Sequence, residues 1–242
     1  MKYIDFHVHI DHYDDANEIL KKCEENQILT LFVTNLPEIF EKHYGYYKNY
    51  KNVRLALGYH PDLISSEEYQ FNENLFNSQL LLTKYIGEVG LDFSKHNLPY
   101  KEKQIEVFEK IVFMGSMMDK IFTIHSRKAE KEVVDILEKF NVRKAIFHWY
   151  SGPLKLVDRI LDLGYYFSVN IGMLKSMNGR KILQKLPIDR IIIESDGPFT
   201  KYLGEISRPE EIEKIYHEFE KFYETENLKN IVYENVRSLL KG

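Results

Sequence analysis

The sequence predicts an α/β protein of the (β/α)8 TIM barrel class, with one domain spanning residues 1–242. Eight short apolar segments with strand character alternate with amphipathic segments of helical spacing along the 242 residues. This number of repeats and this length are typical of a (β/α)8 barrel. Histidines and carboxylates follow the ends of several predicted strands, which is where such barrels carry their active sites. A doubly wound open sheet is the main alternative, because it shows the same alternation.

The first predicted strand, residues 2–10, has two different faces. Strand side chains alternate with a period of two, so Asp5, His7 and His9 share one face. The other face is apolar and consists of Ile4, Phe6, Val8 and Ile10. An acid and two imidazoles that point into a barrel need a cationic partner. A divalent metal ion is the simplest candidate.

The remaining predicted strands are short segments rich in β-branched and aromatic residues, which fits strands that are buried on both faces. They span residues 28–34, 53–59, 85–89, 120–125, 144–148, 165–170 and 189–194.

Between the strands, apolar residues recur at helical spacing. The second helix opens with Pro37, which is favourable in a first turn, and the fourth carries Ile105, Phe108 and Ile111 on one stripe. The segment that begins at Ser65 resembles a capped helix start, followed by a less regular helical stretch to residue 84. Apart from that stretch, the predicted helices, including the second and the fourth, span residues 14–27, 37–50, 101–118, 128–140, 154–163, 179–186, 209–224 and 229–240.

Composition limits the classes of function. The net charge of −4 argues against a broad basic surface that grips duplex nucleic acid, although a small anionic substrate is compatible with it. The single cysteine, Cys23, suits a reducing compartment. The sequence has no recognisable leader peptide and no apolar run of about 20 residues, so we expect a cytoplasmic protein without a membrane span.

Candidate site residues stand at the ends of successive predicted strands. Each one taken alone is more typical of a hydrogen-bonded core or rim residue than of a ligand. Their number is the informative feature, because so much polarity gathered at one rim would be costly without a metal. The candidates are His7, His9, His60, Glu88, His125, His148 and Asp196.

Four histidines and two carboxylates exceed the protein ligands of one zinc ion but suit two divalent ions that share a bridging group. Glu88 is the natural bridge, because a carboxylate has two oxygens and the fourth strand lies between the two groups of histidines. His7, His9 and Asp196 would complete one ion, and His125 and His148 would complete the other. Mixed nitrogen and oxygen ligands favour zinc, manganese or iron over a site that takes only magnesium.

Six motifs together resemble the TatD family of metal-dependent hydrolases, within the amidohydrolase-like barrels. They are DFHVH at residues 5–9, GYHP at 58–61, IGEVGLD at 86–92, IHSR at 124–127, FHWYSG at 147–152 and ESDGPF at 194–199. The resemblance implies a TIM barrel and a two-metal centre that uses His7, His9, Glu88, His125, His148 and Asp196. It also implies hydrolysis of phosphodiester bonds, commonly trimming DNA or RNA from a 3′ end.

Three features depart from the family pattern. Gly197 precedes the proline of the last motif, Pro198, where relatives often have alanine or serine. Trp149-Tyr150 replaces a common Cys-Phe pair. Residues 200–209 match poorly an arginine-containing stretch of many relatives. These departures concern the substrate more than the hydrolytic centre. Some TatD-like proteins belong to anti-phage defence systems, and a divergent pocket with intact ligands would suit that role.

The mechanism that we expect is hydrolysis by water whose pKa two ions lower toward about 7. Asp196 is the expected general base or orienting group, and Glu88 is the bridging catalytic carboxylate. His60 and Arg127 are candidates for contacting the substrate phosphate, although Arg127 equally suits a salt bridge at the rim.

Trp149 could stack on a nucleobase or lie buried between barrel and helix. Asp92 and Glu194 would fix the ligands. Two other functions remain open: hydrolysis of a small substrate other than nucleic acid, and a metal-binding subunit that is active only with partners.

Overall fold

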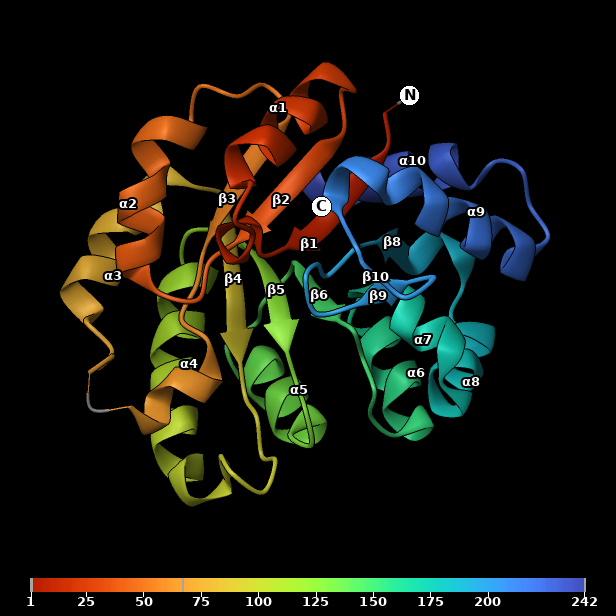
Figure 1. The fold of residues 1–242 in the computed structure, drawn as a ribbon. Coiled ribbons are helices and arrows are strands. Elements are labelled where there is room, and N and C mark those ends of the chain that lie inside the picture. Colours follow the sequence, from red (N-terminus) through yellow and green to blue (C-terminus); the bar gives the residue numbers. More distant parts are fainter. Residues whose placement is uncertain (1, 67, 242) are drawn as a thin grey trace.

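A computed structural model describes residues 2–66 and 68–241, and in this part of the chain eight parallel strands form one barrel (Figure 1). Every strand pairs with its sequence neighbour, so the order in space is the order in the chain. The (β/α)8 prediction is therefore confirmed. The strands are β1 (Ile4–Val8), β2 (Leu29–Val33), β3 (Val53–Leu57), β4 (Tyr85–Gly90), β5 (Ile121–His125), β6 (Ala145–His148), β7 (Tyr166–Val169) and β8 (Ile191–Ile193).

The barrel is closed where the first strand meets the segment after the last one. The amide of Asp196 donates to the carbonyl of His7 at 3.0 Å, and the amide of His9 donates to the carbonyl of Gly197 at 2.9 Å. These two bonds join the ends of β1 and β8 at the carboxyl rim. The predicted metal ligands of the first and last strands are thereby brought side by side.

The helices surround the strands on the outside of the barrel, and α10 lies against β1, so that the two ends of the chain meet (Figure 1). None of the described helices combines the length and the apolar character required to cross a bilayer. The helices are α1 (Ala16–Glu25), α2 (Pro37–Tyr47), α3 (Glu73–Gln79), α4 (Lys101–Ser116), α5 (Glu130–Lys139), α6 (Leu154–Asp162), α7 (Ile171–Lys175), α8 (Met177–Lys185), α9 (Ile212–Tyr223) and α10 (Leu228–Lys241).

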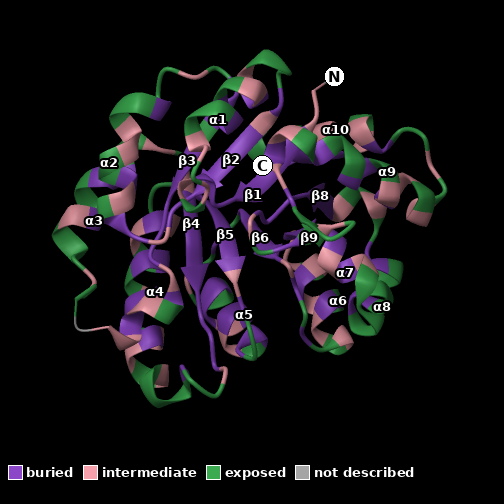
Figure 2. Cartoon of the chain, in the orientation of Figure 1, coloured by how far each residue is buried: buried purple, intermediate pink, exposed green. Residues whose placement is uncertain are grey.

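The core lies between the barrel wall and the inner faces of the helices. Almost all strand residues are buried, while the outer helix faces are exposed (Figure 2). Strands covered on both sides need no polar alternation, and this accounts for apolar runs such as residues 191–193.

The prediction for the segment after β3 is wrong about where its helix starts. His60-Pro61 leads into a 3-10 helix, Pro61–Ser65, and α3 begins only at Glu73. The side chain of Asn72 accepts from the amide of Leu75 at 3.0 Å, so Asn72 caps this helix instead of a serine. Glu67, part of the predicted cap, lies outside the described residues.

Two short elements near the carboxyl rim were not predicted. The first of these is helix α7, which Asn170 caps. The side-chain oxygen of Asn170 accepts from the amides of Gly172 and Met173 at 2.9 and 3.3 Å. A hairpin of β9 (Lys201–Tyr202) and β10 (Glu205–Ile206) follows the last strand. Its turn at Leu203-Gly204 has positive φ at both residues, which is typical of tight hairpins.

Candidate metal centre

The six predicted metal ligands gather at the carboxyl rim of the barrel. His7 and Glu88 lie within β1 and β4, and His125 and His148 are the last residues of β5 and β6. His9 follows β1 directly, and Asp196 follows β8 after Glu194 and Ser195. Five of these side chains are buried and His125 is partly exposed, so the cluster lies at the bottom of the barrel mouth.

The first cluster joins His7, His9, Glu88 and Asp196. The Oε2 atom of Glu88 lies 3.4 Å from Nε2 of His7 and 3.2 Å from Nε2 of His9. Oδ1 of Asp196 lies 4.0 and 3.8 Å from the same two nitrogens. Four donor atoms from three segments of the chain thus face a common centre.

These four atoms fit a divalent ion. Bonds of about 2.0–2.2 Å in a tetrahedral arrangement place ligand atoms roughly 3.4 Å apart, which is close to the spacing observed here. Two of the donors, Nε2 of His7 and Oδ1 of Asp196, are buried and have no hydrogen-bond partner among the described residues. Because leaving buried polar atoms unpaired is costly, a cation is the partner that this geometry lacks.

A second cluster surrounds the other oxygen of Glu88. Oε1 lies 2.8 Å from Nδ1 of His125, 3.3 Å from Nε2 of His60 and 3.8 Å from Nε2 of His148. His60, which sequence reasoning placed near the substrate phosphate, therefore stands among the possible metal ligands. Its position directly after β3, at the same rim, is the signal that could have suggested this.

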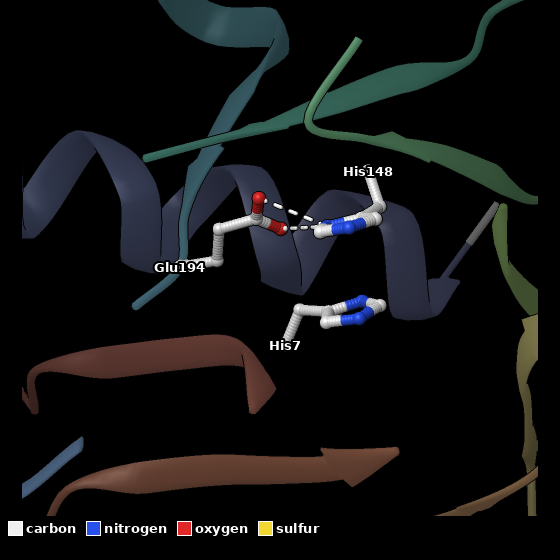
Figure 3. Close-up of side chains that lie close together, drawn as sticks. All are labelled: His7, His148 and Glu194. Atoms are coloured by element: carbon white, nitrogen blue, oxygen red, sulfur yellow. Dashed lines mark hydrogen bonds and ion pairs between the residues drawn. The ribbon is translucent and has the colours of Figure 1, made fainter. Parts of the chain in front are cut away.

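Most ring nitrogens that face away from the clusters have partners of their own. Nδ1 of His148 lies 2.9 Å from both oxygens of Glu194, as Figure 3 shows, and Asn170 donates to the same carboxylate at 2.8 Å. Nδ1 of His7 lies 2.9 Å from the hydroxyl of Thr123. Such contacts fix the orientation of a ligating imidazole and the nitrogen that carries its proton.

Asp92 and Asp5 complete this outer layer. Asp92 lies 3.0 Å from Nε2 of His125, as expected for a residue that fixes a ligand. Asp5 shares the inner face of β1 with His7, yet it accepts from the amide of Ser195 at 2.8 Å and so anchors the loop that carries Asp196. Sequence reasoning missed Thr123 and Asn170, although Thr123 shares the strand parity of His125.

The histidines of the first strand are held neutral. Burial lowers the pKa of His7 to about 4 and also lowers the pKa of His9. The ring of His7 stacks on the ring of His148 at a centroid distance of 3.7 Å, an arrangement visible in Figure 3. Two stacked imidazoles repel each other when both are protonated, so the proton resides on His148 alone.

The opposite shifts occur on the other side of the cluster. Burial alone would lower the pKa of His148, but the carboxylates of Glu194 and Asp196 raise it to about 10. His125 behaves alike, since the carboxylates of Asp92 and Glu88 overcome the effect of burial and raise its pKa to about 9.

The carboxylates of the cluster also differ from one another. Burial would raise the pKa of Glu88, but His60 and the other imidazoles hold it well below its usual range. Burial raises the pKa of Asp196 well above its usual value. The pKa values of these two carboxyl groups are thus shifted in opposite directions.

The backbone at Asp196 is unusual. Its φ is +47°, a left-handed conformation that aspartate tolerates better than most residues. The next residue must be glycine for lack of space, because a Cβ at Gly197 would lie 1.9 Å from the hydroxyl of Tyr13 and 2.2 Å from the carbonyl of Ser207. This explains one departure from the family pattern.

Arg127 and Trp149 lie outside the two clusters. Arg127 is exposed and forms no ion pair with any described residue, so the salt bridge considered for it is not found. Trp149 is partly buried and packs close to Gly172 of α7, where an added Cβ would lie 2.8 Å from the indole. The structure thus favours packing for much of the Trp149 surface.

Comparison with known proteins agrees with this geometry. The chain is 25% identical over 252 residues to an uncharacterized metal-dependent hydrolase of Methanocaldococcus jannaschii, covering 100% of this chain and 98% of the relative. It is 26% identical over 212 residues to the deoxyribonuclease TATDN3 of Homo sapiens, covering 81% and 77%. The crystal structure of the TatD homologue YjjV of Escherichia coli has the same fold, with a TM-score of 0.85, 21% identity and coverage of 98% and 97%. The sequence model for TatD-related DNases matches residues 4–241, and the chain therefore belongs to this family.

Proposed function

We propose that this protein is a two-metal hydrolase that cleaves phosphodiester bonds of DNA, removing nucleotides from a free end. The observation that carries the proposal is the sharing of Glu88: one carboxylate faces two groups of donor atoms through its two oxygens. A bridging carboxylate is typical of centres that hold two ions a few ångströms apart. The deoxyribonuclease name of the human relative supports DNA as the substrate.

The roles of the side chains follow from their positions. His7, His9, Glu88 and Asp196 would hold one ion, while Glu88, His125 and His148 would hold the other, with His60 as a further donor. Bound divalent ions would supply Lewis-acid activation of water and neutralise charge on phosphoryl oxygens. Zinc, manganese and magnesium are the candidate ions.

Asp196 is the proposed general base. Its Oδ1 atom is buried, faces the cluster and has no partner among the described residues. Burial raises the pKa of this carboxyl group well above its usual value, so the carboxylate that ion binding would leave deprotonated is suited to accept a proton. It would take the proton of the attacking water, while Glu194 and Asp92 hold His148 and His125 in position.

The exposed groups at the rim would bind the substrate. The guanidinium of Arg127 is exposed and has no carboxylate partner among the described residues, so it is free to donate to a phosphate. His60 is partly exposed, with 14% of its side chain accessible at the edge of the second cluster. A few side chains at the rim would bind the phosphate, so the proposal needs no broad basic surface and is compatible with the net charge of −4.

The test is elemental analysis of the purified protein, followed by incubation with end-labelled single-stranded DNA under magnesium, manganese or zinc. We expect two ions per chain, a ladder of shortened products, and loss of cleavage in Glu88→Ala and Asp196→Ala. Glu102→Ala, an exposed carboxylate at the start of α4, is the control that should cleave normally.

Three results would contradict the proposal. Full activity of Glu88→Ala and Asp196→Ala would refute the site. Intact DNA together with turnover of a small phosphoester, amide or lactone would indicate a different substrate. Metal binding without any turnover until a partner protein is added would indicate a subunit of a larger complex.

A further inference from the structure

Phe199 is a large apolar side chain that remains 55% exposed beside the metal centre. Its backbone is well anchored, because its amide donates to the carbonyl of Asp196 at 2.9 Å and the next residue, Thr200, is buried. The exposed ring is therefore held in place by its own loop. The hydrolytic centre as described above makes no use of it.

The ring of Phe199 belongs to a group of three aromatic rings that starts at a predicted metal ligand. Its centroid lies 5.0 Å from the ring of His9 and 5.4 Å from the ring of His12, with interplanar angles of 82° and 63°. Nε2 of His9 in turn lies 3.2 Å from Glu88. The exposed ring thus packs directly against a member of the first cluster.

The chemistry of this surface selects its ligand. A phenylalanine ring offers no hydrogen bond, so it binds through its apolar face and prefers flat aromatic partners. The side chain of His12 is 40% exposed and adds a second ring that can also donate a hydrogen bond. In a nucleic acid, the planar aromatic group nearest to a phosphate is the base, and a sugar links the two.

We propose that Phe199 and His12 form a subsite for an unpaired nucleobase next to the phosphate that is cleaved. This inference rests on the proposed function, and it restricts the DNA substrate to single-stranded or frayed ends. A base within a duplex is covered on both faces by its neighbours and cannot stack on the ring. Because every base has a π-face, the subsite tolerates any sequence.

The test combines a change in the protein with a change in the substrate. Single-stranded oligonucleotides are compared with copies that carry an abasic sugar at the nucleotide next to the cleaved bond. Stacking of one base on an aromatic side chain changes binding by about fivefold to a hundredfold. We expect the wild-type protein to lose that factor in kcat/KM on the abasic copy, mainly through KM.

The variants should behave in a matching way. Phe199→Ala should lose the same factor on the ordinary oligonucleotide and should no longer distinguish the two substrates, while Phe199→Trp should retain the wild-type preference. Phe113→Ala is the matched control, because Phe113 is 54% exposed near the end of α4, which leads to the start of β5 at the rim opposite to the cluster. Fluorescence anisotropy of labelled oligonucleotide, measured with chelator so that nothing is cleaved, gives a second readout.

The outcomes separate this inference from the proposed function. Equal kcat/KM of the wild-type protein on both oligonucleotides, or unchanged kcat/KM in Phe199→Ala, overturns the subsite while hydrolysis stands. If the wild-type protein cleaves no nucleic acid, the proposed function fails, and anisotropy then decides: equal binding of both oligonucleotides overturns the subsite as well.

Discussion

The affinity of the centre for metal ions should depend on pH, and the two clusters should differ in this dependence. A ligand must be deprotonated to bind a metal, so a group with a raised pKa gives up a proton when the ion binds. In the first cluster, burial lowers the pKa of His7 to about 4 and also lowers the pKa of His9, while it raises the pKa of Asp196. In the second cluster, His125 and His148 have pKa values of about 9 and 10 and both carry a proton at pH 7.

The magnitude follows from counting these protons. Each proton released changes the affinity tenfold per pH unit at pH values below the raised pKa. Between pH 5 and 8, affinity for the second ion should therefore rise by about a hundredfold per pH unit, because His125 and His148 are both protonated in the metal-free protein and deprotonated in the complex. Affinity for the first ion should rise less steeply, because its two histidines have lowered pKa values and Asp196 alone has a raised one.

The assay is competition between the metal-free protein and a chelator of known affinity, repeated at several pH values and fitted to two sites. Asp92→Asn removes a carboxylate that raises the pKa of His125, so it should reduce the slope of the second site alone. Asp158→Asn, an exposed carboxylate paired with Lys185, is the control and should leave both slopes unchanged. Equal slopes for the two ions, or affinities independent of pH, would refute the reasoning.

Four further predictions concern the stability of the fold and the support of the centre. Removing the ions with a chelator should lower the melting temperature by roughly 5–10 °C, because ions present at about 100 times their Kd stabilise the folded state by about 2.7 kcal/mol; an unchanged melting curve would contradict this. Gly197→Ala, whose Cβ would collide with the Tyr13 hydroxyl, should lower the free energy of unfolding by about 1–3 kcal/mol in urea titrations. Gly45→Ala, in the last turn of α2 with nothing within 4 Å of the added atom, should instead raise it by about 0.5–1 kcal/mol. Glu194→Gln should weaken metal binding by about 10–100-fold, measured by the same chelator competition, because His148 loses the charged partner that orients it.

Much of the fold could be predicted because its signals are local. The apolar segments that became β1 to β8 are short and evenly spaced, and each has a helix beside it with one apolar stripe. The prediction failed where structure depends on distant contacts. Asn72 rather than Ser65 begins α3, and the hairpin after β8 is held to Thr200 by the amide of Ser207.

The gathering of the six candidate ligands could be predicted because a strand end has only one inward parity, and His7, Glu88, His125 and His148 all occupy it. The role of His60 could not be assigned, because it follows β3 in a loop whose path the sequence does not fix. The contacts of Thr123 with His7 and of Asn170 with Glu194 could not be predicted either, because they depend on the orientation of side chains from other strands.

The bonds that close the barrel rim have a consequence for the newborn chain. Asp5 and Ser195, which are joined by one hydrogen bond, lie 190 positions apart, and Asp196 is available only after nearly all strands have left the ribosome. A partly synthesised polypeptide therefore lacks the donor that completes its first cluster. On the proposed function, the protein would in this way cleave no nucleic acid during translation, because the segment after its last strand must dock before the first cluster is complete.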